Sequence, residues 1–369
     1  MNHDASTIPA WSDLTEDADD ESLSTLAAQL ARLDGPVDAL GDWPESLWAV
    51  LAAQGVPRWS MPPEFGGEGC DRVTLLNRYA RVAEGSLTAA FILSQHDAGV
   101  RRLAAAADRM VAREWLVKIA AGQAFTTVGI SHLTTSRRLG PQAMAAVPSG
   151  GGYVLDGVLP WVTAAVTADF LVAGASLADG RQILVALPTD RSGVEVAAPF
   201  PLAALQASCT SEVACTRVVV DEFDLLAGPD LDVVSHTGAA GTGGLETSAL
   251  ALGQARAAIV ALGAEAPSRA DLVEPIGALV DAWRSAWGDL LAAARGVPDG
   301  PTPAQVRGKA NALVLRATQA YLTARKGSGF LRTEPAQRWA RQALFFLVWS
   351  CPSPVAQAAI RDLAGLCPA

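Results

Sequence analysis

Residues 156–165, DGVLPWVTAA, decide how the middle of the chain folds. An Asp-Gly pair, which is a strong turn signal, lies between short apolar runs, and Trp161 and Thr163 follow two residues apart. Further apolar runs flank a second such pair, Asp179-Gly180. We therefore predict an antiparallel sheet domain over residues 121–234, with turns at both Asp-Gly pairs.

Helical periodicity flanks this sheet domain on both sides. Apolar residues recur three and four apart in residues 23–33 and 72–84, which predicts amphipathic helices in an N-terminal domain, residues 22–120. A C-terminal helical domain is predicted over residues 235–369, and one of its helices begins with the capping-box pattern of residues 302–305. The helices predicted there are 245–265, 275–295, 303–326 and 335–350.

Composition excludes several classes of protein. The net charge of -10 is unlike the basic stripe that nucleic acid requires, so we expect no nucleic-acid partner. Residues 1–21 are predicted to be an acidic tail, and they lack the basic segment and the following apolar segment that mark a secretion signal. No apolar run approaches the roughly 18 residues that a membrane span requires. We therefore expect a cytoplasmic protein without a membrane partner. The five Cys and four His residues are scattered, and no metal site is expected.

Motifs in four segments resemble those of the acyl-CoA dehydrogenase family of flavoproteins, in the family's order. The segments are PPEFGGEG (62–69), PWVTAA (160–165), ALALGQARAAI (249–259) and RKGSGFLRTEPAQRWARQA (325–343). The resemblance covers roughly residues 45–350. It implies an α+β fold with an N-terminal helical domain, a central antiparallel β domain and a C-terminal four-helix bundle. It also implies an FAD cofactor and a homodimer or homotetramer, because the family completes its FAD site across subunits.

The same resemblance assigns cofactor contacts. Trp161 stands where the family packs an indole against the flavin ring, and Thr163 where a hydroxyl hydrogen-bonds near the reactive nitrogen. This chemistry is reasonable because an indole covers a flat aromatic surface well and a hydroxyl stabilises negative charge on a reduced ring. The remaining cofactor residues implied by the resemblance are Ser131, Arg269, Gly327 and Gly329.

The sequence departs from the family where the catalytic base is expected. The ungapped register places the family's common Glu on Ser350, which carries no carboxylate. A dehydrogenase then needs another base, and His132 and Glu246 are the candidates. The alternatives are that His132 only fills its loop and that Glu246 is a first-turn carboxylate favoured by the helix dipole. Three further residues are expected on the substrate side: His96, Arg137 and Arg138.

These observations predict an FAD-dependent oxidoreductase that acts on the CH-CH group of an acyl thioester or a related small molecule. The partner would be an electron-transfer flavoprotein or a flavin reductase. One alternative is a flavin-dependent monooxygenase that uses reduced flavin from a reductase, since members of that branch also lack the Glu. A second alternative is a catalytically inactive member of the family.

Overall fold

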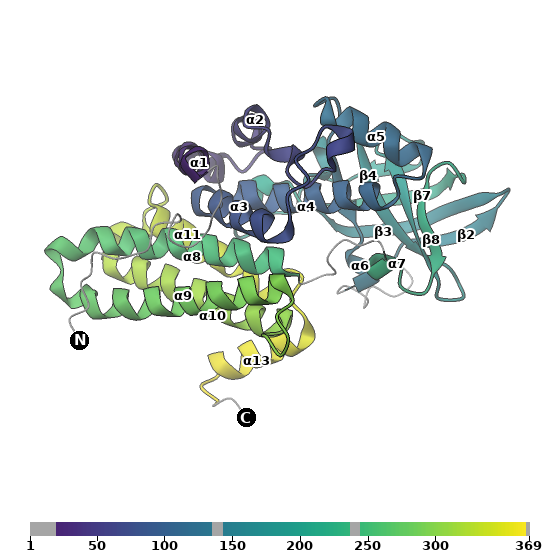
Figure 1. Cartoon of the computed structure of the whole chain (residues 1–369). Coiled ribbons are helices and arrows are strands. Elements are labelled where there is room, and N and C mark those ends of the chain that lie inside the picture. Colours follow the sequence, from purple (N-terminus) through teal and green to yellow (C-terminus); the bar gives the residue numbers. More distant parts are fainter. Residues whose placement is uncertain (1–19, 135–142, 237–243, 367–369) are drawn as a thin grey trace.

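The computed structural model describes residues 20–134, 143–236 and 244–366, and its elements follow the order helices, sheet, helices (Figure 1). The N-terminal part has five longer helices, of which two begin at capping side chains. Asp71 accepts hydrogen bonds from the backbone of Val73 and Thr74, and Ser86 accepts one from Ala89. The helices are α1 Asp20–Leu40, α2 Glu45–Ala53, α3 Arg72–Gly85, α4 Leu87–Ala105 and α5 Met110–Ala120.

The middle of the chain forms one mixed sheet of eight strands. Their order is β6-β7-β3-β2-β4-β5-β8, with β1 beside β4. The predicted antiparallel arrangement holds for most pairs, but β1 and β2 each run parallel to β4. The strands are β1 Thr126–Gly129, β2 Ala145–Ser149, β3 Gly152–Val162, β4 Phe170–Ser176, β5 Gln182–Pro188, β6 Val194–Val196, β7 Ser211–Val220 and β8 Leu225–Asp230.

One of the two predicted turns is correct and the other is wrong. Gly180 has φ +88° and lies in the tight connection between β4 and β5, as the Asp-Gly signal indicates. At Asp156-Gly157 the strand continues, because the pair forms a bulge in β3 against β7. Gly157 is required there: its φ is +127°, and a Cβ would lie 2.6 Å from the carbonyl oxygen of Ala143. An Asp-Gly pair suits a bulge as well as a turn, so the local signal was ambiguous.

The C-terminal part is a helical bundle around α8, which packs on α3, α9 and α10. Gly253 of α8 permits the close approach to α3, since a Cβ would lie 2.1 Å from the carbonyl oxygen of Ala80. The predicted capping box at Thr302 is present. The predicted helix 335–350 is divided at Leu344 into two helices. The elements after the sheet are α7 Val233–His236, α8 Leu245–Glu265, α9 Val273–Arg295, α10 Pro303–Arg325, α11 Pro335–Ala343, α12 Phe345–Val348 and α13 Ser353–Leu363.

Apolar packing joins the three parts. Helices α4 and α5 contact the sheet, where Trp115 stacks on Phe170 at 4.0 Å between ring centroids (Figure 1). By length and composition, the segment Leu245–Ser268 is apolar enough to cross a membrane, but 72% of that apolar window is buried inside the protein. The apolar surface of α8 is therefore used to form the centre of the bundle.

Candidate active site

A cavity of about 480 Å³ lies where the three parts meet, which is a common size for a small-molecule site. Its walls come from α4 through Phe91, from the sheet part through Ser131 and Trp161, and from the region of α12 through Phe345 and Trp349. These residues are far apart in the sequence. Since most of the wall is aromatic or aliphatic, the cavity suits a flat, largely apolar group.

Trp161, at the end of β3, forms one wall of this cavity. Its side chain is 41% exposed and its ring lies 4.8 Å from that of Phe200. Thr163 is buried, and its hydroxyl oxygen accepts a 3.3 Å hydrogen bond from the hydroxyl of Thr210. The Thr210 hydroxyl oxygen also lies 2.9 Å from that of Ser208. Thr210 lines the cavity together with Trp161 and carries a hydroxyl group there. Sequence reasoning did not single out Thr210.

Ser131 begins the short helix α6, Ser131–Thr134, between β1 and β2. Its hydroxyl oxygen is buried and has no hydrogen-bond partner within the described parts of the chain. A buried hydroxyl without a partner costs free energy, so a ligand atom that accepts or donates a hydrogen bond there would be favoured. Ser131 also lines a second cavity, and this position makes it a natural polar contact for a bound ring.

The second cavity, of about 100 Å³, adjoins the first and is more polar. Ser131, Trp161, Trp349 and Ser350 line both cavities, so the two lie next to each other and share part of their walls. Ser350 has φ +45°, a left-handed conformation that is uncommon outside glycine. A backbone held in this region beside a cavity is a frequent mark of a functional site.

Charged residues of α4 and α8 face the second cavity. Glu246, in the first turn of α8, lies 3.5 Å from the Arg101 guanidinium of α4. Next to Arg101, the Tyr79 hydroxyl donates a 2.5 Å hydrogen bond to Asp97. Burial raises the pKa of Asp97 to about 6, although that hydrogen bond and the Arg101 charge oppose the change. The arrangement holds one carboxylate, Glu246, at the cavity wall.

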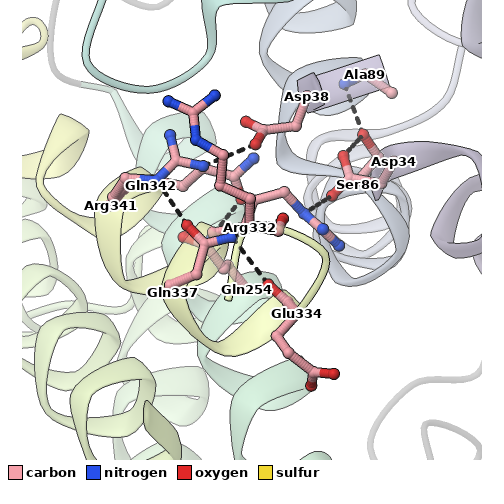
Figure 2. A network of polar contacts seen from close by, with 11 residues as sticks. Asp34, Asp38, Ser86, Ala89, Gln254, Arg332, Glu334, Gln337, Arg341 and Gln342 are labelled. Carbon is pink, nitrogen blue, oxygen red and sulfur yellow. Dashed lines mark hydrogen bonds and ion pairs between the residues drawn. The ribbon is translucent and has the colours of Figure 1, made fainter. Parts of the chain in front are cut away.

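A network of polar contacts fixes the wall that comes from the C-terminal part (Figure 2). Arg338 of α11 donates a 2.7 Å hydrogen bond to Asp34 of α1, and both side chains are almost fully buried. Ser86 donates to the other oxygen of Asp34 at 2.6 Å. Arg341, which lines the larger cavity, pairs with Asp38 at 2.7 Å. These contacts tie α11, and therefore the cavity residues after it, to the N-terminal helices.

The structure brings together some of the predicted site residues. Trp161, Ser131, Glu246 and Ser350 each line at least one of the two adjacent cavities. Thr163 lies directly behind the wall, in contact with Thr210. The substrate-side predictions Arg137 and Arg138 fall outside the described residues.

The two predicted histidines lie elsewhere. His132 is buried and does not line either cavity within the described residues, and burial lowers its pKa to about 4. His96 is buried too, with its Nδ1 3.0 Å from the carbonyl oxygen of Thr126 and its ring stacked on Phe125 at 5.0 Å. Burial also lowers the pKa of His96 to about 4, so both rings are neutral at pH 7.

The predicted phosphate-side residues do not line either cavity within the described residues. Arg269 follows the C-terminus of α8 and makes two hydrogen bonds to Asp271, of 2.8 and 2.7 Å. Glu246 lies in the first turn of the same helix, and the 21 residues of α8 correspond to a length of about 30 Å. Gly327 and Gly329 are in the turn after α10. A single chain therefore does not bring Arg269 to the cavity of Trp161.

Comparisons with known proteins agree with this architecture. Residues 18–123 match the family model described as "Acyl-CoA dehydrogenase, N-terminal domain". A probable acyl-CoA dehydrogenase, YngJ, of Bacillus subtilis is 26% identical over 246 residues, which are 65% of this chain and 65% of the relative. The matched stretch thus spans slightly less than two thirds of that relative's length.

Solved structures share the fold over almost the whole chain. Butyryl-CoA dehydrogenase from Megasphaera elsdenii is 16% identical with a TM-score of 0.77, covering 92% of this chain and 97% of that one. Dibenzothiophene monooxygenase (TdsC) from Paenibacillus sp. A11-2 is 18% identical with a TM-score of 0.74, covering 94% and 97%, and it has also been solved with FMN bound. The fold is therefore that of acyl-CoA dehydrogenase-like proteins. Within it, residues 18–123 match the N-terminal domain of the acyl-CoA dehydrogenase family.

Proposed function

We propose that the chain is a flavin-dependent oxidoreductase that holds its flavin ring in the larger cavity, beside Trp161. The observation that carries this proposal is the half-exposed indole at the wall of an apolar cavity of about 480 Å³. An aromatic wall of this kind is suited to a flat conjugated ring. The match of residues 18–123 to the acyl-CoA dehydrogenase N-terminal domain and the shared fold with FMN-bound TdsC support the same cofactor class.

The residues around the cavity fit a flavin. The free hydroxyl of Ser131 would hydrogen-bond a polar edge of the ring, and the hydroxyl pair of Thr163 and Thr210 would supply a second polar contact. Phe345 and Trp349 would exclude water from the opposite side. When bound, a flavin supplies a two-electron acceptor for a hydride.

The proposed reaction is dehydrogenation of the CH-CH group of an acyl thioester or a related molecule. This reaction requires a base that removes a proton from the substrate. Ser350 carries no carboxylate, whereas Glu246 lines the smaller cavity. Arg101, 3.5 Å away, would hold Glu246 in one orientation. The placement of the two candidate bases therefore favours Glu246 over His132.

A second candidate function is oxygenation by reduced flavin from a partner reductase. The serine at position 350 supports it, since an oxygenase needs no carboxylate to remove a substrate proton there. The similarity of fold to dibenzothiophene monooxygenase is compatible with this reading. The partner would then be a flavin reductase, whereas a dehydrogenase would pass electrons to an electron-transfer flavoprotein.

We propose FAD as the flavin and a homodimer or homotetramer as the functional unit. Arg269, Gly327 and Gly329 would contact the phosphates of FAD bound in a second copy of the chain, because none of the three lines either cavity within the described residues of one chain. The cysteines support a cytoplasmic location, since Cys209, Cys215 and Cys351, among the described residues, form no disulfide.

Titration of the purified protein with FAD and with FMN tests the proposal. We expect saturable binding that changes the flavin absorbance, a loss of affinity of at least about tenfold in Trp161→Ala, and near-normal affinity in Trp161→Phe. Trp115→Phe, in the packing between α5 and the sheet, is the matched control. Failure of the wild type to bind either flavin would favour the inactive alternative.

The reaction is tested with the flavin-loaded protein. Bleaching of the flavin by an acyl-CoA panel without oxygen would support dehydrogenation, and Glu246→Gln should then abolish bleaching while flavin binding persists. Product formation only with a reductase and oxygen would support oxygenation. Glu246→Gln retaining full bleaching would contradict the assigned role of Glu246.

A further inference from the structure

Arg102 of α4 is a buried cation without a matching carboxylate. It is 2% exposed, and the hydrogen bond it makes is donated by its Nη1 to the carbonyl oxygen of Ala98, in its own helix, at 2.9 Å. Its Nε is buried and has no partner, and no carboxylate among the described residues forms an ion pair with it. Buried charges in proteins are normally paired, so this side chain is an exception that requires a reason.

The neighbouring charges do not supply a partner for Arg102. Among the described residues, three charged ones line the smaller cavity, namely Arg101, Arg102 and Glu246, and Glu246 is paired with Arg101. The Asp97 carboxylate also interacts electrostatically with Arg101 and accepts a hydrogen bond from Tyr79. The described part of the cavity lining therefore keeps one positive charge in excess, carried by Arg102.

Burial and the adjacent Arg101 charge lower the pKa of Arg102 to about 10, while Glu246 opposes this change. The guanidinium consequently remains charged at neutral pH but is held at a cost in free energy. An anion that enters the cavity would recover this cost. Arg102 can offer such an anion a planar set of donors, which matches the two oxygens of a carboxylate.

We propose that the smaller cavity is a subsite for a carboxylate group carried by the substrate, with Arg102 as its specificity-determining residue. The inference rests on the proposed function and deepens it, because this cavity shares Trp161 and Ser350 with the one assigned to the flavin. One excess positive charge corresponds to one carboxylate. The volume of about 100 Å³ has room for only a few water-sized groups, which fits the end of a small acid.

The first experiment is independent of flavin and CoA. The melting temperature of the wild type is measured against increasing butyrate and, separately, butyramide, which has the same shape without the charge. We expect butyrate to raise the melting temperature in a dose-dependent way and butyramide to leave it unchanged. Arg102→Gln should weaken butyrate binding about ten- to hundredfold, and Arg102→Lys should restore part of it. The control Arg181→Gln removes an exposed arginine of the β4–β5 turn and should behave as the wild type.

The stability of a further variant separates binding from a structural role. Arg102→Met removes the uncompensated charge, and we expect its melting temperature without ligand to equal or exceed that of the wild type. A large loss of stability in this variant would mean that Arg102 serves the packing of α4, and would overturn the inference. Equal effects of butyrate and butyramide, or full butyrate binding by Arg102→Gln, would overturn it as well.

The second experiment uses the flavin-loaded protein and two thioesters of equal chain length. Succinyl-CoA ends in a carboxylate and butyryl-CoA in a methyl group. We therefore expect succinyl-CoA to perturb the flavin spectrum at a concentration about tenfold lower, or lower still, than butyryl-CoA requires. Equal potency of the two would contradict the carboxylate subsite while leaving the flavin assignment intact. If neither thioester perturbs the spectrum, the proposed thioester reaction fails, and the butyrate titration decides the subsite on its own.

Discussion

Replacing Asp34 by asparagine should destabilise the protein by removing the charge that compensates buried Arg338. The two side chains are 1% and 6% exposed and the bond between them is 2.7 Å, so water cannot replace the lost charge. Breaking a buried ion pair from one side costs about 3–5 kcal/mol. The Asp38 charge repels the ionised Asp34 carboxylate, and the loss of this repulsion in Asp34→Asn offsets part of the cost. We therefore expect the free energy of unfolding to fall by about 3 kcal/mol.

Urea unfolding followed by circular dichroism measures the effect of Asp34→Asn, of Arg338→Met and of the double variant. The double variant should be more stable than the sum of the single losses by about 2 kcal/mol or more, because no buried charge remains unpaired. Since α11 leads into Phe345 and Ser350, Asp34→Asn should also weaken flavin binding. A loss below about 1 kcal/mol, or strictly additive losses, would refute the reasoning.

Three further predictions concern pH, capping and packing. His96 has a pKa of about 4 when folded and an ordinary value of 6.5, so the unfolded chain takes up its proton first as the pH falls. The wild type should therefore lose about 3 kcal/mol more than His96→Asn between pH 6.5 and pH 4 in urea unfolding, and equal losses would contradict this. Thr302→Ala should cost about 1 kcal/mol and Thr302→Ser little, measured in the same way, because the capping hydroxyl is lost only in the first. Gly253→Ala should lower the melting temperature, because the added Cβ clashes with α3. The control Gly308→Ala should not lower it, because the space around its Cβ is open. Equal effects of the two substitutions would disprove the close contact between α8 and α3.

Local signals in the sequence were sufficient for most of the fold. The capping box at Thr302 and the apolar period of residues 245–265 are properties of short segments, and both elements are present as predicted. The division of the predicted helix at Leu344 could not be anticipated, since the apolar run continues through it. The bulge at Gly157 was missed because only the approach of Ala143 from a distant segment distinguishes it from a turn.

The site was less accessible to sequence reasoning. Trp161 was named because it occupies a motif position, and Ser350 because the motif register places the family's missing Glu there; both line the two adjacent cavities, and their roles stay predictions. Arg102 and Thr210 were not found, because an arginine in a helix and a threonine in a strand are ordinary until their burial is known. Tertiary packing gives these residues their significance, and no short-range pattern records it.

A crystal structure of the protein with FAD tests the central claim most directly. We predict that the isoalloxazine ring lies against the indole of Trp161 and within hydrogen-bond reach of the Ser131 hydroxyl, in the cavity of about 480 Å³. A structure from FAD-saturated crystals in which side chains of the protein fill this cavity, or in which the ring binds elsewhere, would contradict the account.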